Sequence, residues 1–314
     1  MKTKTIIGLA AALLLSGCAS PNKTGYTIGI CQYVAHPALD AATQGFIDAV
    51  NELKGEKEVA FDVQSAAADL STCTTISNLF VQKKYDLIMA NATPALQAAA
   101  NSTMTIPILG TSVTEYGVAL SLSDFSGTVG GNISGTSDLA PLDEQAAMFD
   151  ELLPSATRIG LLYCAGEPNS LYQVQVVEQE LRNKGKTTTR ISFSDSNSLQ
   201  AVLSGAIGGV DAIYIPTDNT CADAASTIDG ICSEANIPII AGEEGICSGC
   251  GVATLTIDYY SLGKKTGQMA AEILFEGKDI RTMPIAYDEH PVKKYNPAIC
   301  ARFGLVPPSD YTAI

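Results

Sequence analysis

The 314-residue sequence has no tryptophan and only two histidines, His36 and His290. Sugar-binding clefts commonly stack pyranose rings on tryptophan, so its absence weighs against a sugar ligand, although tyrosine and phenylalanine also stack. Two imidazoles do not complete a zinc site beside a single paired-cysteine motif. Neither histidine lies near a nucleophile motif, and the sequence has no Gly-x-Ser-x-Gly segment. We therefore expect a protein that is not an enzyme and that needs no metal or cofactor.

Basic residues are also few: 19 lysines and arginines stand against 33 aspartates and glutamates, for a formal net charge of −14. An acidic field of this kind repels nucleic acid and anionic membrane surfaces, which argues against both as partners. The chain is longer than one hydrophobic core comfortably serves, and its length fits two lobes. We expect a monomer of compact, globular composition.

The N-terminus carries an export signal. Lys2 and Lys4 precede an apolar run, Ile6 to Leu15, that is too short to span a bilayer. The run leads to Leu-Ser-Gly-Cys, which resembles a bacterial lipobox ending at Cys18. We expect residues 1–17 to be removed, Cys18 to be lipidated, and residues 18–25 to form a flexible linker. The mature protein would then be extracytoplasmic and anchored to the cell membrane.

Eight further cysteines follow Cys18, and the Cys247–Cys250 pair has the spacing of a redox motif or of half a zinc site. An exported chain permits disulfides, but the pairing cannot be read from the sequence. A loop disulfide and plain structural cysteines are the two favoured readings. Cysteines 31, 221, 247 and 250 lie next to loops that would carry a ligand site, so a disulfide there is one hypothesis.

The strongest pattern is a pair of similar segments. In each, a short apolar run ends in a polar turn, a helical stretch follows, and an Ile-Pro-Ile run closes the unit: 85–111 and 210–242. Short runs rich in Ile and Val, alternating with helices, are typical of buried parallel strands in βαβ units. The fold class is therefore α/β, with two similar lobes. Ligands bind beyond the carboxyl ends of such strands, so residues 91–94 and 216–219 should face one cleft from opposite sides.

Short motifs recur along the chain in a characteristic order: Gly135–Leu139, Glu167–Ser170, Pro216–Thr220, Asn236–Pro238 and Asp258–Gly263. In order and spacing they resemble the tryptophan/tyrosine-type substrate-binding proteins of ABC transporters, over essentially the whole mature chain. The resemblance implies the type I periplasmic binding protein fold, with two Rossmann-like lobes that have parallel sheets and are joined by a multi-crossing hinge. It also implies a membrane permease as partner and an amino acid, most often aromatic, as ligand.

Combining the resemblance with the pattern, we expect lobe 1 to comprise residues 26–135 with 257–287, and lobe 2 residues 136–256 with 288–314. The small polar stretch 132–138 would be a crossing between the lobes, and a late helix returning to lobe 1 would complete a hinged clamp.

An amino acid needs hydrogen-bond donors for its carboxylate and acceptors for its ammonium group. Donors are expected from Thr93, Ser112, Thr136 and Ser137, with helix N-termini. Acceptors are expected from Asp218 and Glu243, and Asn169 can do both. Gln32 and Asn219 complete the predicted set, because they follow strand ends on the same rim.

Each residue also has a plainer interpretation. Thr93, Thr136, Ser137, Asp218 and Asn219 could cap helices, and Glu243 and Glu244 would be solvated loop charges. His36, followed by Pro37, is more typical of a loop-shaping residue than of a ligand contact. A ligand-sensing lipoprotein of the same fold, or an importer component for a sugar or nucleoside, remains an alternative function.

Overall fold

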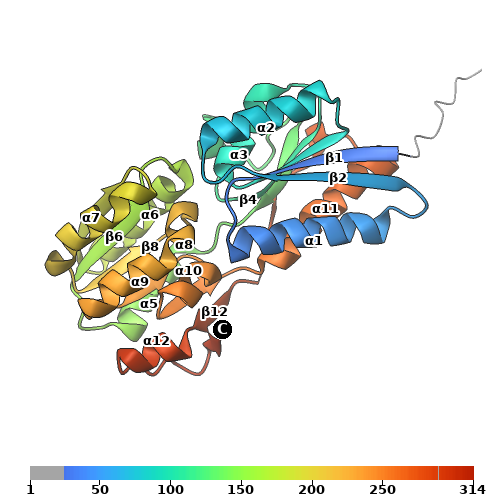
Figure 1. Ribbon diagram of the computed structural model, residues 1–314. Coiled ribbons are helices and arrows are strands. Elements are labelled where there is room, and N and C mark those ends of the chain that lie inside the picture. The colour runs from blue at the N-terminus through green and yellow to red at the C-terminus, as the bar shows by residue number, and fades with distance from the viewer. Residues whose placement is uncertain (1–24, 289) are drawn as a thin grey trace, which may run out of the picture.

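The computed structural model describes residues 25–288 and 290–314. The predicted signal peptide, Cys18 and most of the predicted linker therefore lie outside the described residues. The described chain forms two lobes, each built on one mainly parallel sheet (Figure 1).

Lobe 1 contains a six-stranded parallel sheet with the order β11-β5-β4-β3-β1-β2. Its strands are β1 (Gly25–Gln32), β2 (Glu58–Ser65), β3 (Leu87–Asn91), β4 (Ile108–Val113), β5 (Ile133–Ser137) and β11 (Ala286–Tyr287). Helices α1 (Pro37–Leu53) and α11 (Tyr259–Glu276) cover one face of the sheet, while α2 (Leu70–Gln82) and α3 (Thr93–Ser102) cover the other. Two short elements complete the lobe: α4 (Tyr116–Ala119) follows β4, and η2 (Ile280–Thr282) precedes β11.

Lobe 2 contains a seven-stranded sheet with the order β13-β12-β10-β9-β8-β6-β7, in which β10 and β12 pair antiparallel. The strands are β6 (Arg158–Cys164), β7 (Thr187–Phe193), β8 (Ala212–Ile215), β9 (Ile239–Ala241), β10 (Ala253–Thr256), β12 (Val292–Tyr295) and β13 (Thr312–Ala313). Helices α5 (Leu142–Leu152), α6 (Pro168–Asn183) and α12 (Pro297–Arg302) pack on one face. The other face carries α7 (Ser196–Ala206), η1 (Ile207–Gly209), α8 (Asn219–Asp223), α9 (Ala225–Glu234) and α10 (Glu244–Gly249).

The sequence explains why these elements form. In α1, Pro37 occupies the first turn, where its missing N–H costs nothing, and Phe46 and Val50 bury their side chains on one stripe. Helix α11 ends at Gly277, whose φ of 75° suits a residue without Cβ.

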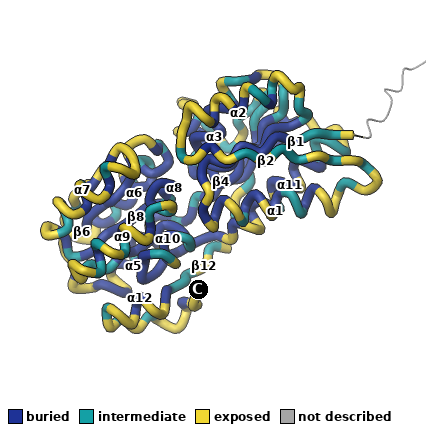
Figure 2. Tube along the Cα trace, viewed as in Figure 1, coloured by how far each residue is buried: buried dark blue, intermediate teal, exposed yellow. Residues whose placement is uncertain are grey.

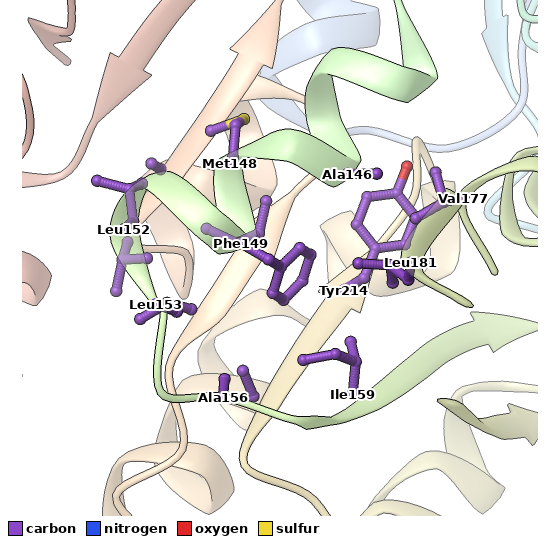
Figure 3. Close-up of a cluster of buried hydrophobic side chains, with 14 of the residues drawn as sticks. Ala146, Met148, Phe149, Leu152, Leu153, Ala156, Ile159, Val177, Leu181 and Tyr214 are labelled. Atoms are coloured by element: carbon purple, nitrogen blue, oxygen red, sulfur yellow. The ribbon is translucent and has the colours of Figure 1, made fainter. Parts of the chain in front are cut away.

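Each lobe has its own core. In lobe 2, side chains of α5 and α6 meet Ile159 of β6 and Tyr214 of β8 (Figure 3). Buried segments run along the strands of both lobes, and exposed residues gather on the outer helices and loops (Figure 2).

The chain passes between the sheets after β5, after β10 and after β11, as a hinged clamp requires. The expectation that residues 132–138 form a crossing was wrong, because most of this stretch is strand β5. Its polar side chains are satisfied inside lobe 1: Ser134 donates to the Met283 carbonyl (2.9 Å), and Thr136 Oγ1 lies 2.8 Å from Thr266 Oγ1. Strand β5 continues to Ser137, past the lobe boundary predicted at residue 135.

Candidate ligand-binding cleft

The candidate site lies where the carboxyl ends of β1, β3 and β4 approach those of β6, β8 and β9 across the gap between the lobes. A direct hydrogen bond bridges the lobes here: His36 Nε2, after β1, lies 3.2 Å from Asn219 Oδ1, after β8. The phenol of Tyr33 also interacts electrostatically with lobe 2, since burial and then the Glu167 carboxylate raise the pKa of Tyr33. These contacts show that the loops after β1 and β8, which were predicted to face one cleft, lie next to each other.

In lobe 1, Thr93 and Ser112 lie at the ends of β3 and β4. They are 2% and 5% exposed, and neither hydroxyl has a hydrogen-bond partner among the described residues. The backbone is strained at both places, with a φ of 89° at Ala92 and 52° at Ser112. Positive φ in residues with a Cβ costs free energy and clusters at ligand sites. These hydroxyls are free to donate to an anionic group beside the N-terminus of α3.

In lobe 2, the Glu167 carboxylate organises the loops facing lobe 1. It is fully buried and accepts hydrogen bonds from Asn219 Nδ2 (2.6 Å), the Thr220 N–H (2.9 Å) and the Thr220 hydroxyl (2.8 Å). Asn169 donates to the Thr217 carbonyl (3.0 Å), which leaves its buried Oδ1 without a partner in the described structure. Asn169 therefore offers an acceptor.

Asp218 is held inside lobe 2. Its carboxylate accepts from the Cys221 N–H (2.8 Å), capping α8, and from the Cys164 N–H (2.7 Å). Burial and the neighbouring Glu167 raise the pKa of Asp218 to about 7. Its predicted pairing with a ligand ammonium stays a prediction, whereas the plainer interpretation of Asp218 as a helix cap is confirmed. An alanine there would remove a buried cap.

Three other predicted residues bond within lobe 1. Gln32 donates to Asp40 (2.6 Å) and accepts from the Thr43 hydroxyl (2.7 Å). Thr136 points into a group of threonine hydroxyls under α11, and Ser137 donates to the Thr114 carbonyl (2.7 Å). The hydrogen bonds of these side chains stabilise lobe 1 and the segment that leads from it to the hinge.

The prediction that Glu243 is a solvated loop charge was wrong. Glu243 is 2% exposed and caps α10 by accepting from the backbone N–H groups of Gly245 (2.6 Å) and Ile246. Burial raises its pKa, and the nearby His36 ring opposes that rise. Glu244 instead pairs with Lys294 at 2.6 Å. The hinge side of this region holds a cavity of about 280 Å³ lined by Ala38, Glu243 and Tyr259, among others.

Sequence reasoning undervalued three residues of the cleft. His36 bridges the lobes, Glu167 orders the opposing loops, and Asp138 is buried at the end of β5 with Tyr259 donating to it (3.0 Å). Glu167 stands at the N-cap position of α6, a local helix-start signal, but its side chain does not cap that helix and instead bonds the loop after β8. The long-range partners of His36 and Asp138 left no trace in the local sequence.

The cysteines are structural. All of those in the described chain, from Cys31 to Cys300, are buried and unpaired thiols. The hypothesised disulfide in a cleft loop is therefore absent, and Cys247 and Cys250 pack in the core at the end of α10. Within residues 25–288 and 290–314, no cluster of metal-ligating side chains is present.

Two parallel-sheet lobes, a hinge crossed repeatedly and a polar cleft at the strand ends define a type I periplasmic binding protein. The sequence profile of the family described as ABC transporter substrate binding protein matches residues 27–304, so the chain belongs to that family. Its members are extracytoplasmic binding proteins and not enzymes, as the sequence predicted. In the described part of the chain, every helix is too short or too polar to cross a bilayer.

Relatives include a tyrosine-binding protein of Clostridioides difficile, 36% identical over 299 residues that span 89% of this chain and 85% of the relative. A Streptococcus pneumoniae ABC domain in complex with L-Trp superimposes with a TM-score of 0.87 at 28% identity, covering 92% of this chain and 100% of the other. The ligand-free, open structure of a Clostridium difficile substrate binding protein is more similar in sequence, at 35% identity. It superimposes with a TM-score of only 0.69, covering 92% of this chain and 99% of the other. The chain as a whole therefore superimposes better on the L-Trp complex than on this ligand-free, open structure.

Proposed function

We propose that this protein binds a free L-amino acid outside the cell, with an aromatic one favoured, and delivers it to an ABC permease. The observation that carries the proposal is that the buried hydroxyls of Thr93 and Ser112 in lobe 1 and the buried Asn169 Oδ1 in lobe 2 all lack a hydrogen-bond partner in the described structure. Buried polar atoms are nearly always hydrogen-bonded, so this group is complete only with a polar ligand between the lobes.

The proposed chemistry divides the ligand between the lobes. Thr93 and Ser112 donate to its α-carboxylate, supported by the N-terminus of α3. Lobe 2 offers the Asn169 oxygen and the negative potential of Glu167 and Asp218 to the ammonium group. A ligand with both charges therefore favours closure, because each lobe attracts a different end of it. Relatives that bind tyrosine and tryptophan support an aromatic side chain.

A thermal-shift screen of the domain from Ala19 onward against the amino acids, nucleosides and common sugars tests the ligand class. A ligand at about 100 times its dissociation constant should stabilise the folded protein by about 2.7 kcal/mol, which raises Tm by a few degrees. We expect shifts with L-Trp, L-Tyr or L-Phe. Hits confined to sugars or nucleosides, or no hit, would contradict the amino-acid proposal.

Matched variants test the site. Thr93→Val and Ser112→Ala should each lower amino-acid affinity about tenfold or more, because each removes a donor to a charged group. Thr254 and Ser77 also have buried, unpartnered hydroxyls, but they lie within β10 and α2, away from the strand ends at the cleft. Thr254→Val and Ser77→Ala should leave affinity unchanged in calorimetric titrations. Equal losses in both pairs would contradict the assignment.

We also propose that the mature protein is anchored by lipid on Cys18. The support is the lipobox-like Leu15–Cys18 sequence after a short apolar run, together with membership in a family of extracytoplasmic proteins.

A further inference from the structure

The hydrogen bonds of the lobe-bridging contact fix the proton on a histidine ring. Glu167 accepts from the backbone N–H groups of Asn219 (3.1 Å) and Thr220 (2.9 Å), so its carboxylate acts as an acceptor. The Asn219 side chain must therefore present its NH₂ group to Glu167, at 2.6 Å, and its oxygen to His36. An amide oxygen only accepts, so His36 Nε2 carries the proton and donates to it.

This leaves the other ring nitrogen of His36 as an acceptor in the neutral ring. His36 is 7% exposed, and its Nδ1 is buried without a hydrogen-bond partner in the described structure. The residue stands at the N-cap position of α1, but its side chain does not cap the helix. Nδ1 is therefore a buried acceptor whose ring is held in place by hydrogen bonds from the opposite lobe. Because no group of the described chain donates to it, we expect the donor to come from a ligand.

The surroundings decide which donor fits. The buried Glu243 carboxylate lies near the His36 ring, and Asn169 contributes a second unpartnered acceptor from lobe 2. An acceptor beside carboxylates favours a cationic N–H group over a neutral indole N–H or phenol O–H. We propose that His36 Nδ1 accepts a hydrogen bond from the ligand ammonium and thereby makes closure depend on an amino group. The inference rests on the proposed amino-acid function.

The same residue then performs two tasks in the closed protein. Its Nε2 donates a hydrogen bond from lobe 1 to Asn219 in the loop after β8, while its Nδ1 accepts one from the ligand. A ligand without an amino group would leave Nδ1 buried and unpaired on closure. The affinity difference between an amino acid and its desamino analogue should therefore exceed the contribution of one hydrogen bond, because the unpaired nitrogen adds a desolvation cost. His36 is thus a specificity-determining residue that links recognition to the lobe-bridging contact.

The first test compares His36→Gln with the wild type by calorimetry, using L-tyrosine with desaminotyrosine and L-tryptophan with indolepropionate. Glutamine can keep a donor near the Nε2 position but has no atom equivalent to Nδ1. We expect H36Q to lose about tenfold or more in affinity for the amino acid and to change little toward the desamino analogue. Equal losses for both ligands, or no loss for the amino acid, would overturn the inference. Wild type that binds no amino acid would instead overturn the proposed function.

A second measurement needs no variant. Because the chain has only two histidines, ¹⁵N NMR of selectively labelled protein resolves both imidazole rings. We expect His36 to hold its proton on Nε2 and its Nδ1 resonance to move when the amino acid binds, with His290 as internal reference. A proton on Nδ1, in either a neutral or a charged ring, would overturn the inference.

Discussion

Asp138 is a buried carboxylate at the end of β5, and its environment makes stability depend on pH. Burial raises its pKa to about 6, while the Tyr259 hydroxyl donates to it at 3.0 Å. Between these pH values the folded state therefore holds a proton that the unfolded chain, with an ordinary pKa of about 4, has released. The stability that Asp138 contributes is complete below about pH 4 and is lost as pH rises through about 6.

Asp138→Asn should therefore stabilise the ligand-free protein at pH 7, by up to about 3 kcal/mol, since an amide keeps an acceptor for Tyr259 without a buried charge. The gain over wild type should shrink as pH falls from 7 to 5. Differential scanning calorimetry across this range measures both. Asp124→Asn, at an exposed position, is the control and should show no such trend. A variant less stable than wild type at pH 7 would mean that the charged form is favoured.

At the same scale, the candidate site was predictable only in part. Thr93, Ser112 and Asn169 were selected because small polar residues after buried strands are a local pattern, and the structure leaves each with an unpartnered atom. Gln32 was selected on the same pattern, yet its bonds to Asp40 and Thr43 lie inside lobe 1. Which polar groups remain free depends on partners far away in sequence, and the sequence does not contain that information in local form.

Secondary structure was more predictable than side-chain partners. The strand-helix-strand plan predicted for residues 85–111 is formed by β3, α3 and β4, and the one predicted for residues 210–242 is formed by β8, α8, α9 and β9. The failures were β5 and α10, both rich in small or polar residues. Strand β5 is held by long-range bonds such as Ser134 to Met283, and α10 by the Glu243 cap, so neither has the apolar period that identifies an element.

Helices α1 and α11 pack so closely that glycine is required at their contact. A Cβ on Gly263 would collide with the Ala42 carbonyl, and one on Gly45 with the Tyr260 carbonyl. Gly263→Ala should destabilise the protein by about 1–3 kcal/mol or more, because backbone cannot move aside as a flexible side chain can. Urea unfolding measures the loss.

Gly230 gives the matched control, since it lies inside α9 with open space where a Cβ would be. Gly230→Ala should be neutral or stabilise by up to about 1 kcal/mol, because alanine loses less backbone entropy in a helix. Losses of similar size in both variants would show that helical glycine is not needed for the α1 to α11 contact.

At the scale of the whole molecule, the start of β1 and the cleft lie at opposite ends of lobe 1. The carboxyl ends of the parallel strands face lobe 2, whereas Gly25 starts β1 at the amino end, away from lobe 2 (Figure 1). A tether entering at Gly25 therefore leaves the cleft and the crossings after β5, β10 and β11 unobstructed. Anchoring and ligand closure should be independent of each other.

This independence can be tested through Cys18, whose lipidation we proposed from the sequence. Labelling cells with a palmitate analogue should mark the wild type, and Cys18→Ala should abolish the label because no other thiol follows a lipobox. Cys300→Ala, which removes a buried thiol of lobe 2, should keep it. The domain beginning at Ala19 should bind the amino acid with the same affinity as the lipidated protein in detergent. A label that persists in C18A would contradict the anchor, and a difference in affinity would mean that the tether acts on the lobes.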